Sequence, residues 1–283
     1  MMNSVVDKIK NIELYTKRLM QVNLLGHSRS LVKGSGLDFD QLRDYQIGDD
    51  VRALDWNSSA RMNRLLVKQF NDERHRTVIV ALDISSSGLY GSQMLKHEIL
   101  AQIAAIISYA GQLGKDDVGL ILFTDKIELY IPPKKGRSHI QLILEKIFSA
   151  QQKHARTSIS GVLEYIARLK KKNAMVFLVS DFIDDNFEHK LSLVSRLCDV
   201  IAIRITDEYE RQFPALGLIT VQDSETKLMQ VIDARRSGAV SFLRSRLEEQ
   251  KRVFTKNRVD LLDISNTTVL IDRLIHFFKG RKR

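Results

Sequence analysis

The chain is poor in the residues that mark several classes of protein. Of its 283 residues, one is cysteine, three are proline and 14 are glycine. The single cysteine, Cys198, excludes an internal disulfide and suits a reducing compartment. No run of about 20 apolar residues occurs, so we expect no membrane-spanning helix. Charged residues such as Asp7, Lys8 and Lys10 interrupt the start of the chain where a signal would need an apolar core, so we expect no secretory signal. We therefore expect a cytoplasmic protein.

The chain is rich in apolar residues and carries an excess of positive charge. Its hydrophobic content of 44% is enough for a large core, and its formal net charge is +10. The excess is C-terminal, because residues 225–283 hold 14 Lys and Arg against 7 Asp and Glu. A solvated helix with a basic tail is the simpler interpretation, and contact with nucleic acid or an acidic membrane is the alternative. We find no zinc finger and no aromatic-glycine RNA motif, so the nucleic-acid signal is weak.

Apolar runs alternate with amphipathic segments from Arg76 onward. This alternation predicts an α/β fold with a mostly parallel central sheet and helices on both faces. We expect one domain over residues 76–283, with residues 1–75, a helix and an irregular charged segment, packed on it. The predicted strands cover 76–83, 117–123, 127–131, 174–180, 198–205 and 259–262, with a hairpin over 216–222 and 227–232. The predicted helices cover 5–25, 92–113, 138–149, 159–171, 187–196, 237–255 and 267–279.

A short polar motif follows the first strand of this alternating region. Residues 83–87 read Asp-Ile-Ser-Ser-Ser directly after an apolar run. The motif lies at the strand's carboxyl end, where open α/β sheets place their ligands. A carboxylate and two hydroxyls are hard oxygen donors, which favour Mg²⁺, Mn²⁺ or Ca²⁺ over zinc. So few ligands leave coordination positions open for something else to fill.

Two later segments add oxygen donors to this motif. Thr157 and Ser158 precede an amphipathic helix, and Asp181 ends the apolar strand over 174–180. If the strands ending at Asp83 and Asp181 are parallel neighbours, their carboxyl ends meet at one edge of the sheet. We therefore predict a site for Mg²⁺ (or Mn²⁺). Its predicted ligands are Asp83, Ser85, Ser87, Thr157 and Asp181.

The segment before the first strand is dense in aspartate and arginine and holds the only tryptophan. We expect a salt-bridged cap with Trp56 buried, in which Arg43, Arg52 and Arg61 make bidentate contacts with nearby aspartates. The expected aspartate partners are Asp44, Asp50 and Asp55. A carboxylate cluster for two-metal hydrolysis is the alternative, but such sites draw on several strands and these acids share one stretch. The residues assigned to a structural role are Asp38, Arg43, Asp50, Arg52, Asp55 and Trp56.

The order of short motifs in this segment resembles a known bacterial family. Residues 36–39, 42–45, 48–51 and 54–56, followed by the motif at 83–87, are similar to the family catalogued as domain of unknown function fifty-eight. That resemblance implies a Rossmann-like von Willebrand factor type A domain with a metal-ion-dependent adhesion site (MIDAS). It also implies a partner, a MoxR-type AAA+ ATPase, for which this chain acts as an adaptor, with a client protein as a further partner.

The chain departs from the family pattern in two places. Ser158 stands where an aspartate often follows the threonine, which costs the site one nearby carboxylate. Many members also carry an N-terminal membrane hairpin, which we do not expect in this chain.

Three functions fit these residues. The leading one is a non-catalytic interaction module, in which a partner's Glu or Asp replaces a water on the metal. A haloacid-dehalogenase-type phosphatase is the alternative, but it needs a second aspartate where this chain has Ser85, whose hydroxyl cannot act as a general acid. In the third, the site is vestigial and the hydroxyls only cap helices and loops.

Overall fold

The computed structural model describes residues 38–71, 76–86, 95–150, 156–184, 186–207, 218–222, 229–233, 237–265 and 270–281. The chain divides into two units, of which the smaller comprises Gly26–His75 and the larger comprises Met1–Leu25 with Arg76–Arg283. The helix predicted over 5–25 lies outside the described residues. The packing of residues 1–75 on the core stays a prediction.

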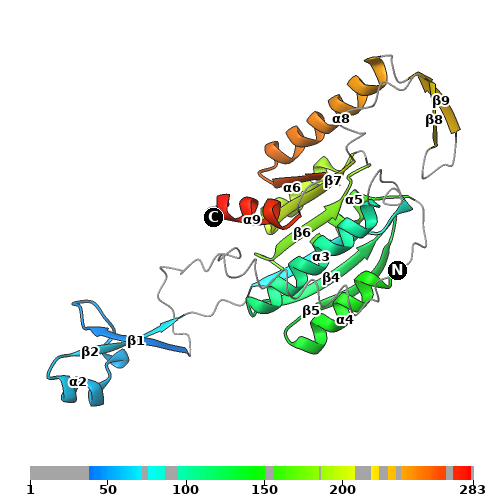
Figure 1. Cartoon of the computed structure of the whole chain (residues 1–283). Helices are drawn as coiled ribbons and strands as arrows, with labels where there is room; N and C mark the ends of the chain where they lie inside the picture. The colour runs from blue at the N-terminus through cyan, green and yellow to red at the C-terminus, as the bar shows by residue number, and fades with distance from the viewer. Residues whose placement is uncertain are drawn as a thin grey trace. The chain divides into compact units, whose positions relative to one another are not determined.

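A six-stranded sheet forms the centre of the larger unit (Figure 1). Every neighbouring pair is parallel except β4 and β5. The strand order is β10-β7-β6-β3-β4-β5. When these six strands are renumbered 1 to 6 along the chain and read from the β5 edge, this is the 3-2-1-4-5-6 order of a doubly wound fold. The strands are β3 (Thr77–Asp83), β4 (Asp117–Phe123), β5 (Ile127–Lys134), β6 (Met175–Ser180), β7 (Asp199–Thr206) and β10 (Asp260–Ser265), with β8 (Leu218–Gln222) and β9 (Met229–Asp233) in the hairpin.

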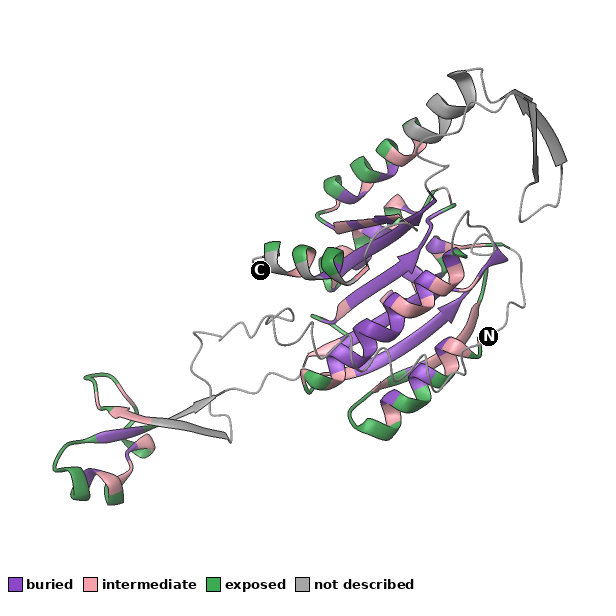
Figure 2. Cartoon of the chain, in the orientation of Figure 1, coloured by how far each residue is buried: buried purple, intermediate pink, exposed green. Residues whose placement is uncertain are grey.

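Helices cover both faces of this sheet. One face packs on α3 (Lys96–Leu113), α4 (Arg137–Phe148) and α9 (Leu270–Gly280), and the other packs on α5 (Ile159–Arg168), α6 (Glu188–Leu197) and α8 (Ser237–Lys256). Successive residues of a strand point to opposite faces. In β3, Val78 and Val80 therefore join the first core layer, and Ile79 and Ala81 join the second. The central strands are buried on both sides, as Figure 2 shows, which explains why their sequences read as continuous apolar runs.

The predicted α/β architecture is confirmed, and two strands extend further than their sequence pattern indicated. β5 continues through Pro132 and Pro133 to residue 134, which is possible because it is an edge strand. β10 continues to Ser265 although Asp263 interrupts its apolar run, because that carboxylate pairs with Arg204 of β7. Among the described helices, none has the length and apolar character that crossing a membrane requires.

The smaller unit is built on one antiparallel strand pair. β1 (Asp38–Asp44) pairs with β2 (Leu66–Asn71), and a 3₁₀ turn, η1 (Val51–Ala53), and a short helix, α2 (Trp56–Met62), lie between them in the chain. The side chain of Asp50 caps η1 by accepting a hydrogen bond from the Arg52 N–H. Asp55 caps α2 by accepting from the Ser58 N–H. The stretch predicted to be irregular is therefore ordered locally, mainly by aspartate caps.

The predicted ion pairs of this unit are wrong in their partners. Arg43 makes its bidentate contact with Asp49, at 2.6 and 2.5 Å, and this contact raises the pKa of Arg43. The side chains of Arg52 and Arg61 are exposed, and the carboxylates expected to bind them, Asp50 and Asp55, instead cap helices. The side chain of Asp38 lies outside the described residues. Asp50 and Asp55 act as caps because each lies only two or three residues from the N–H that donates to it, and Asp55 also pairs with Lys68 at 3.6 Å.

The burial predicted for Trp56 is also wrong, because 63% of this residue is exposed. The described apolar core of the smaller unit consists of Leu54, Leu66 and Val67. So small a core cannot enclose an indole ring, since the fraction of buried surface falls with the size of a unit.

We expect Arg43 to stabilise the smaller unit and Arg52 not to. Arg43→Ala removes the bidentate pair with Asp49 and should lower the local unfolding free energy of residues 38–71 by about 1 kcal/mol. Arg52→Ala alters only an exposed side chain and should change it by less than about 0.5 kcal/mol. Amide hydrogen exchange over β1 and β2 measures both. Equal protection in the two variants would contradict this assignment.

Candidate metal centre

The polar motifs meet at the point where the strand order of the sheet reverses. β3 and β6 are parallel neighbours, with Leu82 paired to Val179. Asp83 is the last residue of β3, and Asp181 directly follows β6. Doubly wound sheets bind their ligands outside the carboxyl ends of the strands at this switch point. The predicted convergence of Asp83 and Asp181 is therefore confirmed at the level of topology.

Two hydroxyl groups from distant parts of the chain meet beside this edge. The Thr157 hydroxyl donates a hydrogen bond to the Ser85 oxygen at 2.7 Å. Adjacent ligands of an octahedral Mg²⁺, with bonds of about 2.0–2.1 Å, lie about 2.9 Å apart. The two oxygens thus have nearly the spacing that a shared cation needs. Ser87 lies outside the described residues, so its place in the predicted set stays a prediction.

Hydrogen bonds from the residues after Thr157 hold the loop before α5 in place. The Ser158 N–H donates to the Thr124 carbonyl at 3.0 Å, and the Ser158 side chain caps α5 by accepting from the Gly161 N–H. The Ile159 N–H donates to Asp184 Oδ2 at 2.6 Å, which ties the loop before α5 to the loop after β6. Ser158 therefore has a local capping role, and the Asp184 carboxylate from another loop reaches the same helix end.

The Asp83 carboxylate is buried, and both of its oxygens accept hydrogen bonds. Oδ1 accepts from the Ser85 N–H at 2.9 Å, and Oδ2 accepts from the Ser180 hydroxyl at 2.6 Å. Burial raises the pKa of Asp83 to about 7, and the neighbouring charge of Asp181 adds to the rise, while the two hydrogen bonds oppose it. The raised pKa reflects first the cost of burying a charged carboxylate and second its repulsion by Asp181, and a bound cation would offset both.

The Asp181 carboxylate is buried with one oxygen incompletely satisfied. Oδ1 accepts from the Ile183 N–H at 3.3 Å. Oδ2 makes no hydrogen bond within the described part of the chain, and its nearest charged partner is the Lys96 ammonium at 3.7 Å. A buried oxygen without a hydrogen bond calls for an explanation, and a bound cation is one.

These donors fit a hard divalent cation. The structure brings together two carboxylates, Asp83 and Asp181, and two hydroxyls, Ser85 and Thr157, all of them oxygen ligands. The described residues contain no group of three His, Cys, Asp or Glu that could hold a metal. A zinc-type site is thus not formed by these residues, and the donor chemistry favours Mg²⁺ or Mn²⁺.

Several residues that the sequence did not point to support the centre. Phe182, next to Asp181, has a left-handed backbone with φ of 56°. Its carbonyl accepts a hydrogen bond from the Gln250 side chain at 2.6 Å, and Gln250 in turn accepts from Arg204 at 2.9 Å. Arg204 is also paired with Asp263 through two hydrogen bonds, at 2.5 and 2.7 Å. This network ties the loop that carries Asp181 to α8, β7 and β10.

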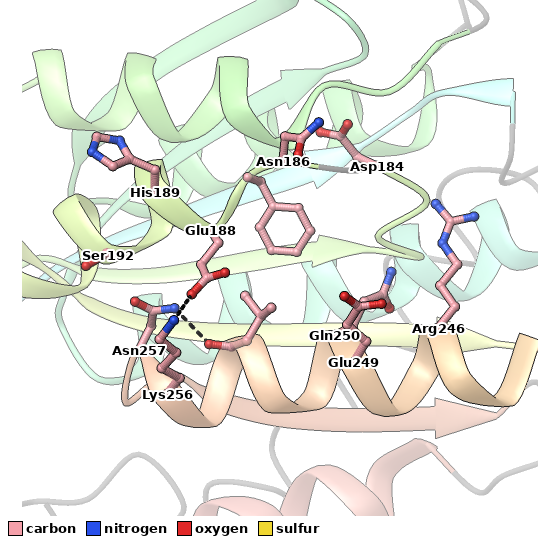
Figure 3. Close-up of a pocket in the computed structure, with 12 residues that line it drawn as sticks. Asp184, Asn186, Glu188, His189, Ser192, Arg246, Glu249, Gln250, Lys256 and Asn257 are labelled. Atoms are coloured by element: carbon pink, nitrogen blue, oxygen red, sulfur yellow. Dashed lines mark hydrogen bonds and ion pairs between the residues drawn. The ribbon is translucent and has the colours of Figure 1, made fainter.

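A pocket of about 760 Å³ lies beside that loop, between α6 and α8 (Figure 3). The Lys256 ammonium and the Glu188 carboxylate bridge its two walls at 2.7 Å. None of the predicted metal ligands lines it, but Asp184 and Gln250 do. The pocket and the metal centre therefore share a loop and not a site.

We expect the stability of the metal-free protein to fall as Asp83 ionises. Its folded pKa of about 7 lies above the value of about 3.9 in an unfolded chain. The stabilising contribution is therefore fully present below about pH 4 and is lost as the pH rises through about 7. Urea unfolding in EDTA should show wild type losing stability relative to Asp83→Asn between pH 5 and 8. A difference independent of pH would show that Asp83 keeps an ordinary pKa.

The doubly wound sheet and the oxygen donors at its switch point define an α/β protein with a candidate cation site. The chain matches the family described as "Protein of unknown function DUF58" over residues 41–253 and belongs to it. This confirms the resemblance drawn from the motifs at 36–56 and 83–87.

Several known proteins are similar to this chain. "Uncharacterized protein Mb1516" of Mycobacterium bovis is 26% identical over 222 residues, which cover 77% of this chain and 70% of that protein. "Uncharacterized protein YeaD" of Bacillus subtilis is 33% identical over 106 residues, covering 38% of this chain and 25% of that protein. The solved SpRpn10 VWA domain has a TM-score of 0.39 at 8% identity, over 71% of this chain and 94% of that one. Mussel proximal thread matrix protein 1 has a TM-score of 0.38 at 17% identity. The match covers 46% of this chain and 38% of the mussel protein.

Proposed function

We propose that this protein is a non-catalytic interaction module of the von Willebrand factor type A kind, which binds an acidic partner through Mg²⁺ (or Mn²⁺). The observation that carries the proposal is the hydrogen bond between Ser85 and Thr157, 72 residues apart, beside the buried carboxylates of Asp83 and Asp181. A bound Mg²⁺ supplies a coordination position that a partner's carboxylate can occupy. The chain's own residues hold the cation and leave that position open.

The residues present support binding rather than hydrolysis. Position 85, where a phosphatase of the alternative type needs a general acid, is a serine whose side chain is committed to Thr157. Ser85 and Thr157 are neutral donors, so among these four residues only Asp83 and Asp181 offset the charge of a divalent ion. A cation held in this way attracts an acidic side chain, and that attraction is the chemistry of recognition we propose.

The proposed partner is a MoxR-type AAA+ ATPase, for which this protein acts as a cytoplasmic adaptor toward a client. Membership of the DUF58 family supports this choice. The basic residues of the C-terminal region, 14 Lys and Arg against 7 Asp and Glu over 225–283, support long-range attraction to an acidic surface. That contribution should weaken as salt is added.

Binding of the purified ATPase to wild type and to Asp83→Ala tests this function. Both measurements keep Mg²⁺ constant, because the ATPase itself needs Mg²⁺ and EDTA would disable it. We expect wild type to bind and Asp83→Ala to lose at least about tenfold in affinity, the loss for one charged contact of about 1.4 kcal/mol. Equal binding by the two proteins would separate the metal centre from partner recognition. Metal-dependent hydrolysis of a phosphate ester by the pure protein would favour the enzyme instead.

A further inference from the structure

Lys96 occupies a position that is unfavourable for a lysine. It is the first residue of α3, and its side chain is only 1% exposed. Lysine is almost never fully buried unless its charge is paired. The N-terminus of a helix is also the positive end of its dipole, which repels an ammonium. The Asp181 carboxylate, 3.7 Å away, compensates this charge.

The Lys96 ammonium has opposite effects on a cation bound at the centre and on an anion bound to that cation. Because it lies beside Asp181, a predicted ligand, it repels any cation that Asp181 helps to bind. It attracts any anion that binds the cation afterwards. These two effects follow from the sign of one charge and hold whatever other charges lie nearby.

We propose that Lys96 sets the charge of the metal centre, so that it weakens divalent-cation binding by the free protein and strengthens carboxylate binding by the metal-loaded protein. This inference rests on the proposed function and deepens it. Since coupling between two ligands is reciprocal, a carboxylate that gains from the cation also tightens the binding of that cation. The centre is then filled most firmly when an acidic partner is present.

The test is a set of Mg²⁺ titrations of the full chain, measured by calorimetry. They are carried out in potassium chloride and in potassium acetate of equal ionic strength. Acetate is the carboxylate probe. In wild type, acetate should tighten Mg²⁺ binding. In Lys96→Met, Mg²⁺ should bind at least about tenfold more tightly in chloride, the effect of removing one unit charge a few ångströms away. The tightening by acetate should shrink at least about threefold.

Two further proteins sharpen this comparison. Lys190→Met removes one positive charge from the partly exposed pair with Glu164 on α5 and α6, so it changes the total charge equally and should leave both affinities unchanged. Lys96→Gln removes the buried charge but keeps a polar head group, and it should behave like Lys96→Met. Without metal, both Lys96 variants should melt below wild type, and saturating Mg²⁺ should restore most of that loss.

Each result bears on the proposal. Unchanged or weaker Mg²⁺ binding in both Lys96 variants would overturn it, and so would changes of the same sign for Mg²⁺ and acetate. Unfolding of both variants even in saturating Mg²⁺ would also overturn it. A bound cation should compensate the negative charge of Asp83 and Asp181 once Lys96 is replaced. Failure of wild type itself to bind Mg²⁺ would instead contradict the proposed function.

Discussion

Replacing Asp83 with alanine is expected to abolish the stabilisation of this protein by Mg²⁺. A ligand present at 100 times its dissociation constant stabilises the folded state by about 2.7 kcal/mol. For a unit of this size that corresponds to a rise in melting temperature of about 5–10 °C. Asp83→Ala removes the carboxylate at the end of β3, whose oxygens are positioned by Ser85 and Ser180. The variant should melt at the same temperature with and without millimolar Mg²⁺.

Asp125→Asn is the matched control for this experiment. Asp125 follows the neighbouring strand β4 at the same edge of the sheet, but its side chain is exposed. Its replacement should leave the response to Mg²⁺ intact. If wild type ignores both Mg²⁺ and Mn²⁺, the centre is vestigial or forms only with its partner. A full response in Asp83→Ala would place the cation elsewhere in the molecule.

Replacing Arg204 with methionine is expected to cause a large loss of stability. Arg204 is 3% exposed and donates to Asp263, to Gln250 and to the Leu247 carbonyl, which joins β7 to β10 and α8. Breaking a buried ion pair costs about 3–5 kcal/mol. Asp263 keeps some contact with water, so we expect about 3 kcal/mol, or a melting temperature lower by about 6–12 °C.

The exposed pair between Arg168 and Glu164 provides the comparison. Arg168→Met should cost less than about 1 kcal/mol, because an exposed ion pair gains little in water. Urea unfolding of both variants measures the difference. A loss in Arg204→Met no larger than in Arg168→Met would show that the buried network does not stabilise the fold.

The sheet and its helices were predictable from the sequence because their patterns are local. Strands such as 77–83 and 175–180 are buried on both faces, so each reads as one apolar run with a polar residue at its end. The doubly wound connection then places Asp83 and Asp181 at one edge. β10 was harder to delimit, because Asp263 looks like the end of a strand until its partner on β7 is known.

The supporting residues of the metal centre could not be predicted in the same way. Lys96 begins an amphipathic helix, where a lysine is normally exposed, and its burial depends on tertiary packing around Asp181. Gln250 lies on α8, and its hydrogen bond to Phe182 spans 68 residues. Only Ser180 had a sequence signal, since it directly precedes Asp181.

The smaller unit shows the same division between local and distant causes. Its aspartates could be assigned to structure from the sequence, but the capping roles of Asp50 and Asp55 depend on where η1 and α2 begin. Trp56 was expected to be buried in a salt-bridged cap, yet the described core of the unit is too small to cover it.

The central claim is that the switch point of the sheet holds a divalent cation that remains open to a carboxylate. Crystals grown with Mn²⁺ and acetate test it most directly, through the anomalous scattering of Mn²⁺. We predict one anomalous peak beside Ser85 and Thr157, close to Asp83 and Asp181, with an acetate oxygen in its coordination sphere. Absence of a peak at this place, in crystals that hold Mn²⁺ elsewhere, would contradict the claim.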